Sequence, residues 1–148
     1  MFLNCHSYYS LRYGTLSIEK LVETAKACGV TTLALTDINN STGIIDFVKT
    51  CRENGIRPVA GIEFRKDEKL LYIGLARNKE GFRELNEFLS YHTLNRLPLP
   101  NQAPEFENVV LIYPLQSSEI AKWRNSENSP THQLVSSSAC QLANSPAR

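Results

Sequence analysis

The spacing of hydrophobic residues along this chain alternates between short runs typical of strands and the periodic spacing typical of helices. A short hydrophobic run over 30–35 is typical of a buried strand. Before it, hydrophobic residues recur at helical spacing between Ser17, a good N-cap, and Gly29, a residue type that commonly ends helices. The chain opens with another hydrophobic run over 2–7. The pattern therefore predicts a strand, a helix and a second strand.

The next stretch repeats this pattern and then departs from it. A polar loop over 39–42 leads into a second predicted helix that ends at Gly55. The hydrophobic face predicted for this helix consists of Ile44, Ile45, Val48 and Cys51. A strand is predicted over 57–64, followed by a charged turn over 65–69 and a strand over 70–76. Because so few residues separate these two strands, we expect them to form an antiparallel hairpin.

A third helix and a fifth strand complete the predicted elements. Asn78 caps the helix, and the strand covers 109–113. The hydrophobic face of the helix consists of Phe82, Leu85, Phe88 and Leu89. The order β-α-β-α-β-β-α-β favours an α/β fold whose strands are mostly parallel. A closed barrel needs about seven or eight βα units, so we expect only the first part of such a barrel here.

The composition changes after Pro114. Residues 117–148 contain eight serines, and no hydrophobic periodicity is visible from position 127 onward, so 127–148 is predicted to be disordered. A short helix over 118–124 fits the pattern, and Trp123 within it could either pack on the core or stay outside it. We therefore expect one domain over 1–115 and a serine-rich tail over 116–148.

Charge and cysteine usage narrow the class of protein. A net charge of +1 gives no whole-chain attraction to nucleic acid or to a membrane. Cys28 and Cys51 fall near the ends of predicted helices, and no CxxC pair is present, which favours buried free thiols. No hydrophobic run approaches the roughly 18 residues that span a bilayer, and no signal-peptide pattern opens the chain. These features favour a cytoplasmic protein without a membrane partner.

Polar side chains stand at the ends of three predicted strands. His6, Asp37 and Glu63 each follow a hydrophobic run, about one strand–helix unit apart. The carboxyl ends of strands in βα-wound sheets lie together on one face, where ligands bind. We therefore expect the three side chains to converge, and a histidine with two carboxylates can serve a metal site or acid–base chemistry.

Four blocks of the sequence resemble a known family. The segments over 4–11, 34–37, 55–64 and 75–85 are similar, in order and spacing, to the polymerase-and-histidinol-phosphatase (PHP) domain. The resemblance is to the form found at the N-terminus of the α subunit of bacterial DNA polymerase III, and it covers about residues 1–114. It implies the first part of a distorted (β/α)7 barrel. It also implies a site where several His, Asp and Glu side chains hold zinc or manganese ions that activate water for phosphoester hydrolysis.

The residues of this chain match that implied site only in part. Where the family has His-x-His, the chain has Asn4 before His6, and three further ligand positions are occupied by Tyr13, Ile38 and Leu71. Of the ligands that the resemblance implies for the first half of the domain, only His6 and Glu63 remain. Asp37 corresponds to the neighbour of a ligand. Two protein ligands make a poor metal site, so we expect a vestigial site without cofactor, or zinc or manganese if it is occupied.

This partial match favours a structural role over catalysis. The first hypothesis is a truncated N-terminal PHP-like domain of a polymerase III α subunit, with a degenerate metal site and no catalytic residues of its own. The resemblance implies that its partners are the remainder of the α subunit and the proofreading exonuclease subunit. Contact with DNA would then occur only through the full-length polymerase.

Two other hypotheses remain open. One is a stand-alone metal-dependent phosphoesterase, of phosphatase or exonuclease type, that recruits Asn4, Cys5 or Asp37 as substitute ligands. The other is a noncatalytic adaptor whose serine-rich tail binds another protein. An interrupted reading frame would explain the composition of the tail equally well.

Overall fold

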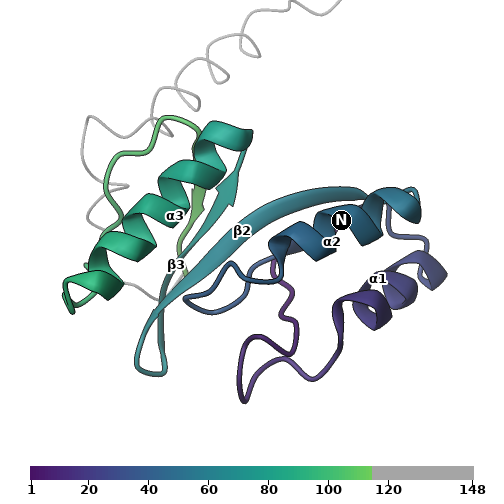
Figure 1. Cartoon of the computed structure of the whole chain (residues 1–148), viewed down its shortest axis with the longest axis horizontal. Helices are drawn as coiled ribbons and strands as arrows, with labels where there is room; N and C mark the ends of the chain where they lie inside the picture. Colours follow the sequence, from purple (N-terminus) through teal and green to yellow (C-terminus); the bar gives the residue numbers. More distant parts are fainter. Residues whose placement is uncertain (115–148) are drawn as a thin grey trace, which may run out of the picture. The chain divides into compact units, whose positions relative to one another are not determined.

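The computed structural model describes residues 1–114, which form three helices and four strands. In chain order these are α1 (Ile18–Ala27), β1 (Thr32–Leu35), α2 (Ile44–Glu53), β2 (Arg57–Lys66), β3 (Lys69–Ala76), α3 (Lys79–Leu94) and β4 (Val109–Ile112). Figure 1 shows their arrangement. The helix predicted over 118–124, Trp123, Cys140 and the predicted tail over 116–148 lie outside the described residues.

The four strands form one mixed sheet in the order β1-β2-β3-β4. β1 and β2 are parallel, whereas β3 runs antiparallel to both β2 and β4. The predicted hairpin between β2 and β3 is confirmed. By these pairings β1, β2 and β4 run in one direction and β3 in the other, so most strands share a direction, although β1 and β2 are the one parallel pair of neighbours in the described sheet. The fold is thus mixed α/β.

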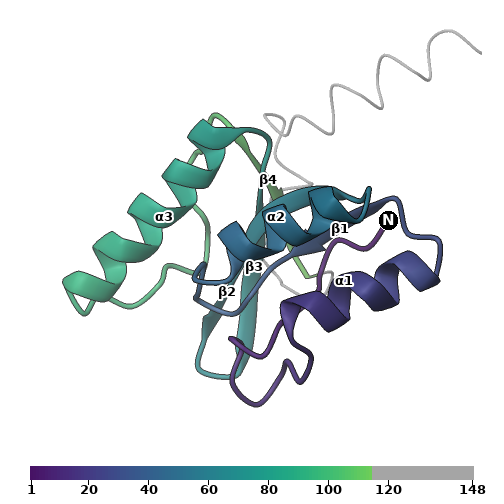
Figure 2. The ribbon, with the colours of Figure 1, turned by 45° about the vertical axis from the view of Figure 1, so that its right-hand side comes forward.

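The opening segment lies beside β1 without forming a regular strand. A single parallel bridge joins Phe2 to Leu33, and the amide of Thr36 donates to the carbonyl of Cys5 at 2.9 Å. Figure 2 shows the N-terminus next to β1. The strand predicted over 2–7 is therefore wrong as a regular element, but the segment still runs along β1 and carries its polar residues to the end of that strand.

The ends of α1 follow the sequence signals. The Ser17 hydroxyl accepts a hydrogen bond from the amide of Lys20 at 3.3 Å, and Gly29 adopts a φ of 69°, where a residue without a β-carbon is favoured. Cys28 follows the last residue of α1 and is exposed, so the prediction of a buried thiol is wrong there. Cys51 is fully buried, as predicted.

The face of α2 differs from the prediction at one position. Ile45 is 71% exposed, while Phe47 is fully buried. Residues three apart lie on one side of a helix, so Ile44, Phe47 and Cys51 form the inner face and Ile45 points away from it. The hydrophobic pair at positions 44 and 45 could not both face the core.

The core lies on both sides of β1. Leu33 and Leu35 pack with the buried residues of α1 and α2, while Ala34 packs with Ile73 and Leu75 of β3. This alternation is the side-chain period of a strand whose two faces are both covered. The helices α1 and α2 contact each other, and α3 packs on β3.

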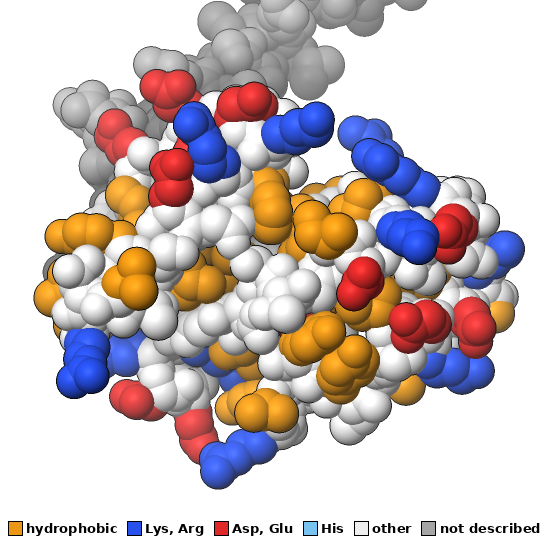
Figure 3. Space-filling view, in the orientation of Figure 1, with side chains coloured by type: hydrophobic (Ala, Val, Ile, Leu, Met, Phe, Trp, Pro, Cys, Tyr) orange, Lys and Arg blue, Asp and Glu red, His pale blue; other side chains and the backbone are white. Residues whose placement is uncertain are grey.

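Several large hydrophobic side chains stay on the surface of the described part. Leu11 and Leu94 are each 82% exposed. In Figure 3, hydrophobic side chains gather in small groups between charged ones on the face shown. Within residues 1–114, no helix is both long and apolar enough to cross a membrane.

Candidate functional site

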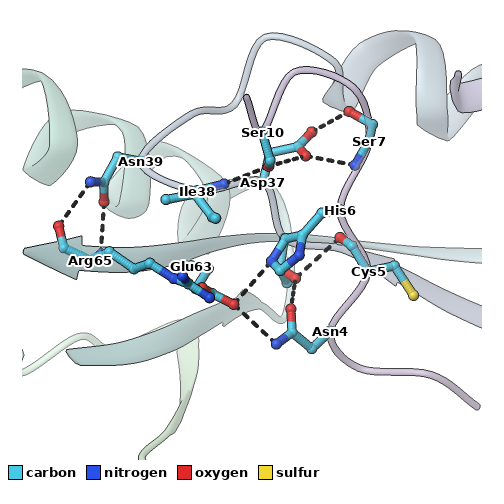
Figure 4. A network of polar contacts seen from close by, with 11 residues as sticks. Asn4, Cys5, His6, Ser7, Ser10, Asp37, Ile38, Asn39, Glu63 and Arg65 are labelled. Atoms are coloured by element: carbon cyan, nitrogen blue, oxygen red, sulfur yellow. Dashed lines mark hydrogen bonds and ion pairs between the residues drawn. The ribbon is translucent and has the colours of Figure 1, made fainter. Parts of the chain in front are cut away.

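The strand ends bring the predicted polar residues into one neighbourhood. Figure 4 shows His6 close to Glu63, with Asp37 nearby beside Ser7 and Ser10. The bridge between Ile38 and Glu63 continues the pairing of β1 and β2 past the end of β1. The predicted convergence is therefore found, but the two carboxylates belong to two separate hydrogen-bond networks.

Glu63 is completely buried, and both of its carboxylate oxygens have partners. Its Oε2 lies 3.0 Å from the Nε2 of His6 and accepts a second hydrogen bond, also of 3.0 Å, from the side-chain amide of Asn4. Its Oε1 accepts a hydrogen bond from the Nε of Arg65. The carboxylate thus sits between one guanidinium, one imidazole and one amide.

These partners keep Glu63 ionised. Burial by itself raises the pKa of the carboxyl group, because a low-dielectric environment penalises the charged form. The hydrogen bonds from His6, Arg65 and Asn4 outweigh burial, and the net pKa of Glu63 lies below its ordinary value. Glu63 is therefore a buried anion that its neighbours have compensated.

Asn4 connects this network to the end of β1. Its carbonyl oxygen accepts a hydrogen bond of 2.7 Å from the hydroxyl of Thr36, while its NH2 group donates to Glu63. One amide therefore serves as donor and acceptor at once. A single ring nitrogen of a histidine could not both donate to Glu63 and accept from Thr36. Asn4 therefore fits this site as a hydrogen-bonding link.

Asp37 forms the second network with residues of the opening segment. Its Oδ1 accepts from the backbone amide of Ser7 at 2.7 Å and from the Ser10 hydroxyl at 2.6 Å, and its Oδ2 accepts from the Ser7 hydroxyl at 2.7 Å. Asp37 and both serines are almost fully buried. Sequence analysis did not foresee the two serines in this role.

The segment after Ser7 folds back tightly around this carboxylate. The amides of Tyr13 and Gly14 both donate to the carbonyl of Ser10. A β-carbon on Gly14 would lie 1.8 Å from the carbonyl oxygen of Ser7, which no side chain could tolerate. Asp37 and Gly14 together fix the loop over 7–14, and this loop determines where Tyr13 lies.

Sequence analysis also missed Arg65, because this residue was assigned to a charged turn. In the structure β2 continues through Lys66, so Arg65 extends over the same face of the strand as Glu63. Its guanidinium carbon lies 4.2 Å from the ring centre of Tyr13. A signal was available in principle, since residues two apart in a strand point to the same side.

This set of residues does not fit a metal ion. Among residues 1–114, no group of three or more His, Cys, Asp or Glu side chains is arranged to hold one. The carboxylate oxygens of Glu63 are directed at an amide, an imidazole and a guanidinium, and two of these are donors that cannot bind a cation. The buried side chain of Leu71 offers no ligand atom. The roles of His6 and Glu63 are therefore explained by hydrogen bonding.

Comparison with known proteins points to one family and one context. The sequence profile of the PHP domain matches residues 3–128. The α subunit of DNA polymerase III from Chlamydia muridarum is 37% identical over 97 residues, and that from Treponema pallidum is 38% identical over 97 residues. Each match covers 56% of this chain and 8% of the relative, so the chain corresponds to a small part of those proteins.

A solved structure supports the fold. A protein from Bifidobacterium adolescentis, classed as a metal-dependent phosphoesterase, superposes with a TM-score of 0.50 and 21% sequence identity. The superposition covers 64% of this chain and 32% of that protein. At this level of identity the likeness concerns the fold alone. With the profile matching most of the sequence, the chain belongs to the PHP domain family.

Proposed function

We propose that this chain is a PHP domain of the DNA polymerase III α-subunit type whose metal site is degenerate and whose role in DNA replication is structural. In this role it supports the folded polymerase polypeptide and does not hydrolyse phosphoesters. We expect its partners to be the remainder of an α subunit and the proofreading exonuclease subunit. DNA would be contacted through the whole polymerase only.

One observation carries this proposal. Every oxygen of the buried carboxylate at the candidate metal site is already engaged by a side chain, with His6 and Asn4 on Oε2 and Arg65 on Oε1. A catalytic metal needs three or more protein ligands and an open position for water. The similarity to polymerase α subunits supports the replication context.

The surface of the domain also supports a role within a larger assembly. Leu11, Ile45 and Leu94 are strongly exposed, and their side chains would be shielded from water by a covering partner. We propose a distorted (β/α)7 barrel as the complete architecture, of which the described residues form the first part.

A stand-alone phosphoesterase is the second candidate. It is favoured by the fold shared with the protein from Bifidobacterium adolescentis and by the contact between His6 and Glu63. It requires that a metal ion displace Asn4 or Arg65 from the carboxylate of Glu63. The two candidates therefore differ in whether the wild-type chain binds metal.

The test is metal content by mass spectrometry on the full chain purified without chelator, beside a His6→Ala/Glu63→Ala variant. The proposal expects less than about a tenth of an equivalent of zinc or manganese in both proteins, since two protein ligands bind weakly. About one equivalent in the wild type that is lost in the variant would overturn it. That result would lead directly to assays with phosphoester substrates.

A further inference from the structure

The buried carboxylate of Glu63 requires a positive charge close to it. An isolated ionised carboxylate costs a large desolvation free energy when it is buried, unless a cation and hydrogen bonds compensate it. In a PHP site that binds metal, the metal ion supplies this charge. In this chain the charged side chain in direct contact with Oε1 is Arg65.

Arg65 is held in place by contacts with three residues. Its backbone amide donates to the Oδ1 of Asn39 at 2.9 Å, and its carbonyl accepts from the Nδ2 of the same residue at 2.8 Å. Its guanidinium lies on the ring of Tyr13 and donates through Nε to Glu63. The side chain is only 15% exposed, so it is part of the interior of the site.

The neighbouring strand leaves room for this arrangement. The pairing of β2 with β3 shifts between Phe64 and Arg65, so that Leu71 has no partner in β2. Such an irregularity changes the twist of the pair and the direction of nearby side chains. Leu71, which occupies a position where the family has a ligand, thus lies at the point where the register changes beside Arg65.

We propose that the guanidinium of Arg65 is the resident cation of this site, where it takes the place of a metal ion. Tyr13 and Asn39 position it, and together they exclude a divalent cation from Oε1 of Glu63. This inference rests on the proposed function, because it assumes that the wild-type chain holds no metal. It adds that a metal ion is excluded for two reasons: most of its ligands are missing, and a side-chain cation already occupies its place.

The test returns one ligand and then removes the cation. Asn4→His places an imidazole at the position whose amide nitrogen now lies 3.0 Å from Oε2 of Glu63, and a second variant adds Arg65→Met to it. The matched control adds Arg57→Met instead, which removes the same charge from an exposed position on the same strand. Manganese binding is measured on the full chain by equilibrium dialysis, with circular dichroism as the check of folding.

We expect below about a tenth of an equivalent of manganese in Asn4→His and in the control. We expect about one equivalent in Asn4→His/Arg65→Met, because two imidazoles and the carboxylate, with its Oε1 now open, then provide three ligands. About one equivalent in Asn4→His alone would overturn the proposal, because Arg65 would then exclude nothing. No binding by a folded Asn4→His/Arg65→Met variant would overturn it as well. Both failures leave a metal-free wild type intact, so they differ from failure of the proposed function.

A second measurement, thermal melting, tests the same role of Arg65 without metal. Removing the cation should lower the melting temperature, and adding Glu63→Gln should recover most of that loss, because a neutral amide needs no counter-charge. Recovery supports the role of Arg65 as the resident cation. A Glu63→Gln/Arg65→Met variant that melts no higher than Arg65→Met would contradict it.

Discussion

Asp37 and Glu63 are both buried carboxylates at the end of a strand, yet their surroundings differ in kind. Asp37 accepts hydrogen bonds from one backbone amide and two hydroxyl groups, all neutral, and all from the loop over 7–14. Glu63 accepts from the side chains of Asn4 and Arg65 and contacts His6. One carboxylate organises a loop, whereas the other is surrounded by side chains that include a guanidinium and an imidazole.

The difference shows two ways in which a fold can stabilise a buried carboxylate. A carboxylate surrounded by short-range neutral donors is satisfied whether or not any ligand is present. A buried carboxylate with few neutral donors needs a cation close to it, or it becomes a buried charge without compensation. The chain keeps Asp37 as a structural anchor and supplies Glu63 with a guanidinium.

The largest effect is expected for Asp37→Ala. This change leaves the Ser7 amide and two hydroxyls without their acceptor, and we expect the free energy of unfolding to fall by about 3–4 kcal/mol. Urea unfolding followed by circular dichroism measures it. Asp46→Ala, at an exposed position in the first turn of α2, is the control and should change stability by about 0.5 kcal/mol or less. A loss at position 37 as small as the control would show that the loop does not depend on Asp37.

A smaller effect is expected for Glu63→Gln. The amide keeps the size of the side chain but weakens hydrogen bonds that are charge-assisted in the wild type, and we expect a loss of about 2 kcal/mol in the free energy of unfolding. The same urea experiment measures it. An increase in stability would mean that desolvation of the charged pair costs more than its attraction returns, and the contrast with Asp37 would then have to be reversed.

Acidification should reduce the difference between the wild type and Glu63→Gln. The folded pKa of Glu63 lies below the unfolded value of about 4.3, so its contribution is fully present above that pH. It is lost as the pH falls through the lowered folded pKa. Free energies of unfolding of both proteins, measured from pH 7 down to pH 3.5, should therefore converge. A gap that stays constant or widens on acidification would show that ionisation of Glu63 does not stabilise the fold.

The smallest effect is expected for Tyr13→Leu. This change removes the ring on which Arg65 lies and should reduce the free energy of unfolding by about 0.5–1 kcal/mol. Tyr13→Phe keeps the ring and should retain most of the stability. Equal losses in the two variants would indicate that the phenol hydroxyl matters and the ring–guanidinium contact does not.

Local signals in the sequence were enough for most of the elements. The caps at Ser17 and Asn78 accept the hydrogen bonds expected of them, and the hairpin between β2 and β3 was predicted from the short connection between the two strands. A prediction failed in α2, where the local sequence fits two different orientations of the helix equally well. Ile44 and Ile45 are equally hydrophobic, and only the position of the sheet decides which of them is buried.

The candidate site was predictable in its backbone and less so in its partners. The topology placed His6, Asp37 and Glu63 at neighbouring strand ends, as expected. Ser7 and Ser10 were missed because hydrogen bonds between residues about 30 positions apart leave no trace in spacing. Arg65 was missed for another reason: it looked like part of a charged turn, and the extension of β2 to Lys66 reveals its direction.

The contact between Asn39 and Arg65 has a consequence for the tendency of this protein to aggregate. Over 57–60 the outer edge of β2 is covered by β1, and at Glu63 the backbone amide and carbonyl bond to Asp37 and Asn39. The side chain of Asn39 then supplies one donor and one acceptor to the backbone of Arg65, as an adjoining strand would. On this side of β2, the backbone groups at these positions are therefore already hydrogen-bonded. An incoming strand could not pair with them, and the side chain of Asn39 thus protects this edge from the strand addition that begins aggregation.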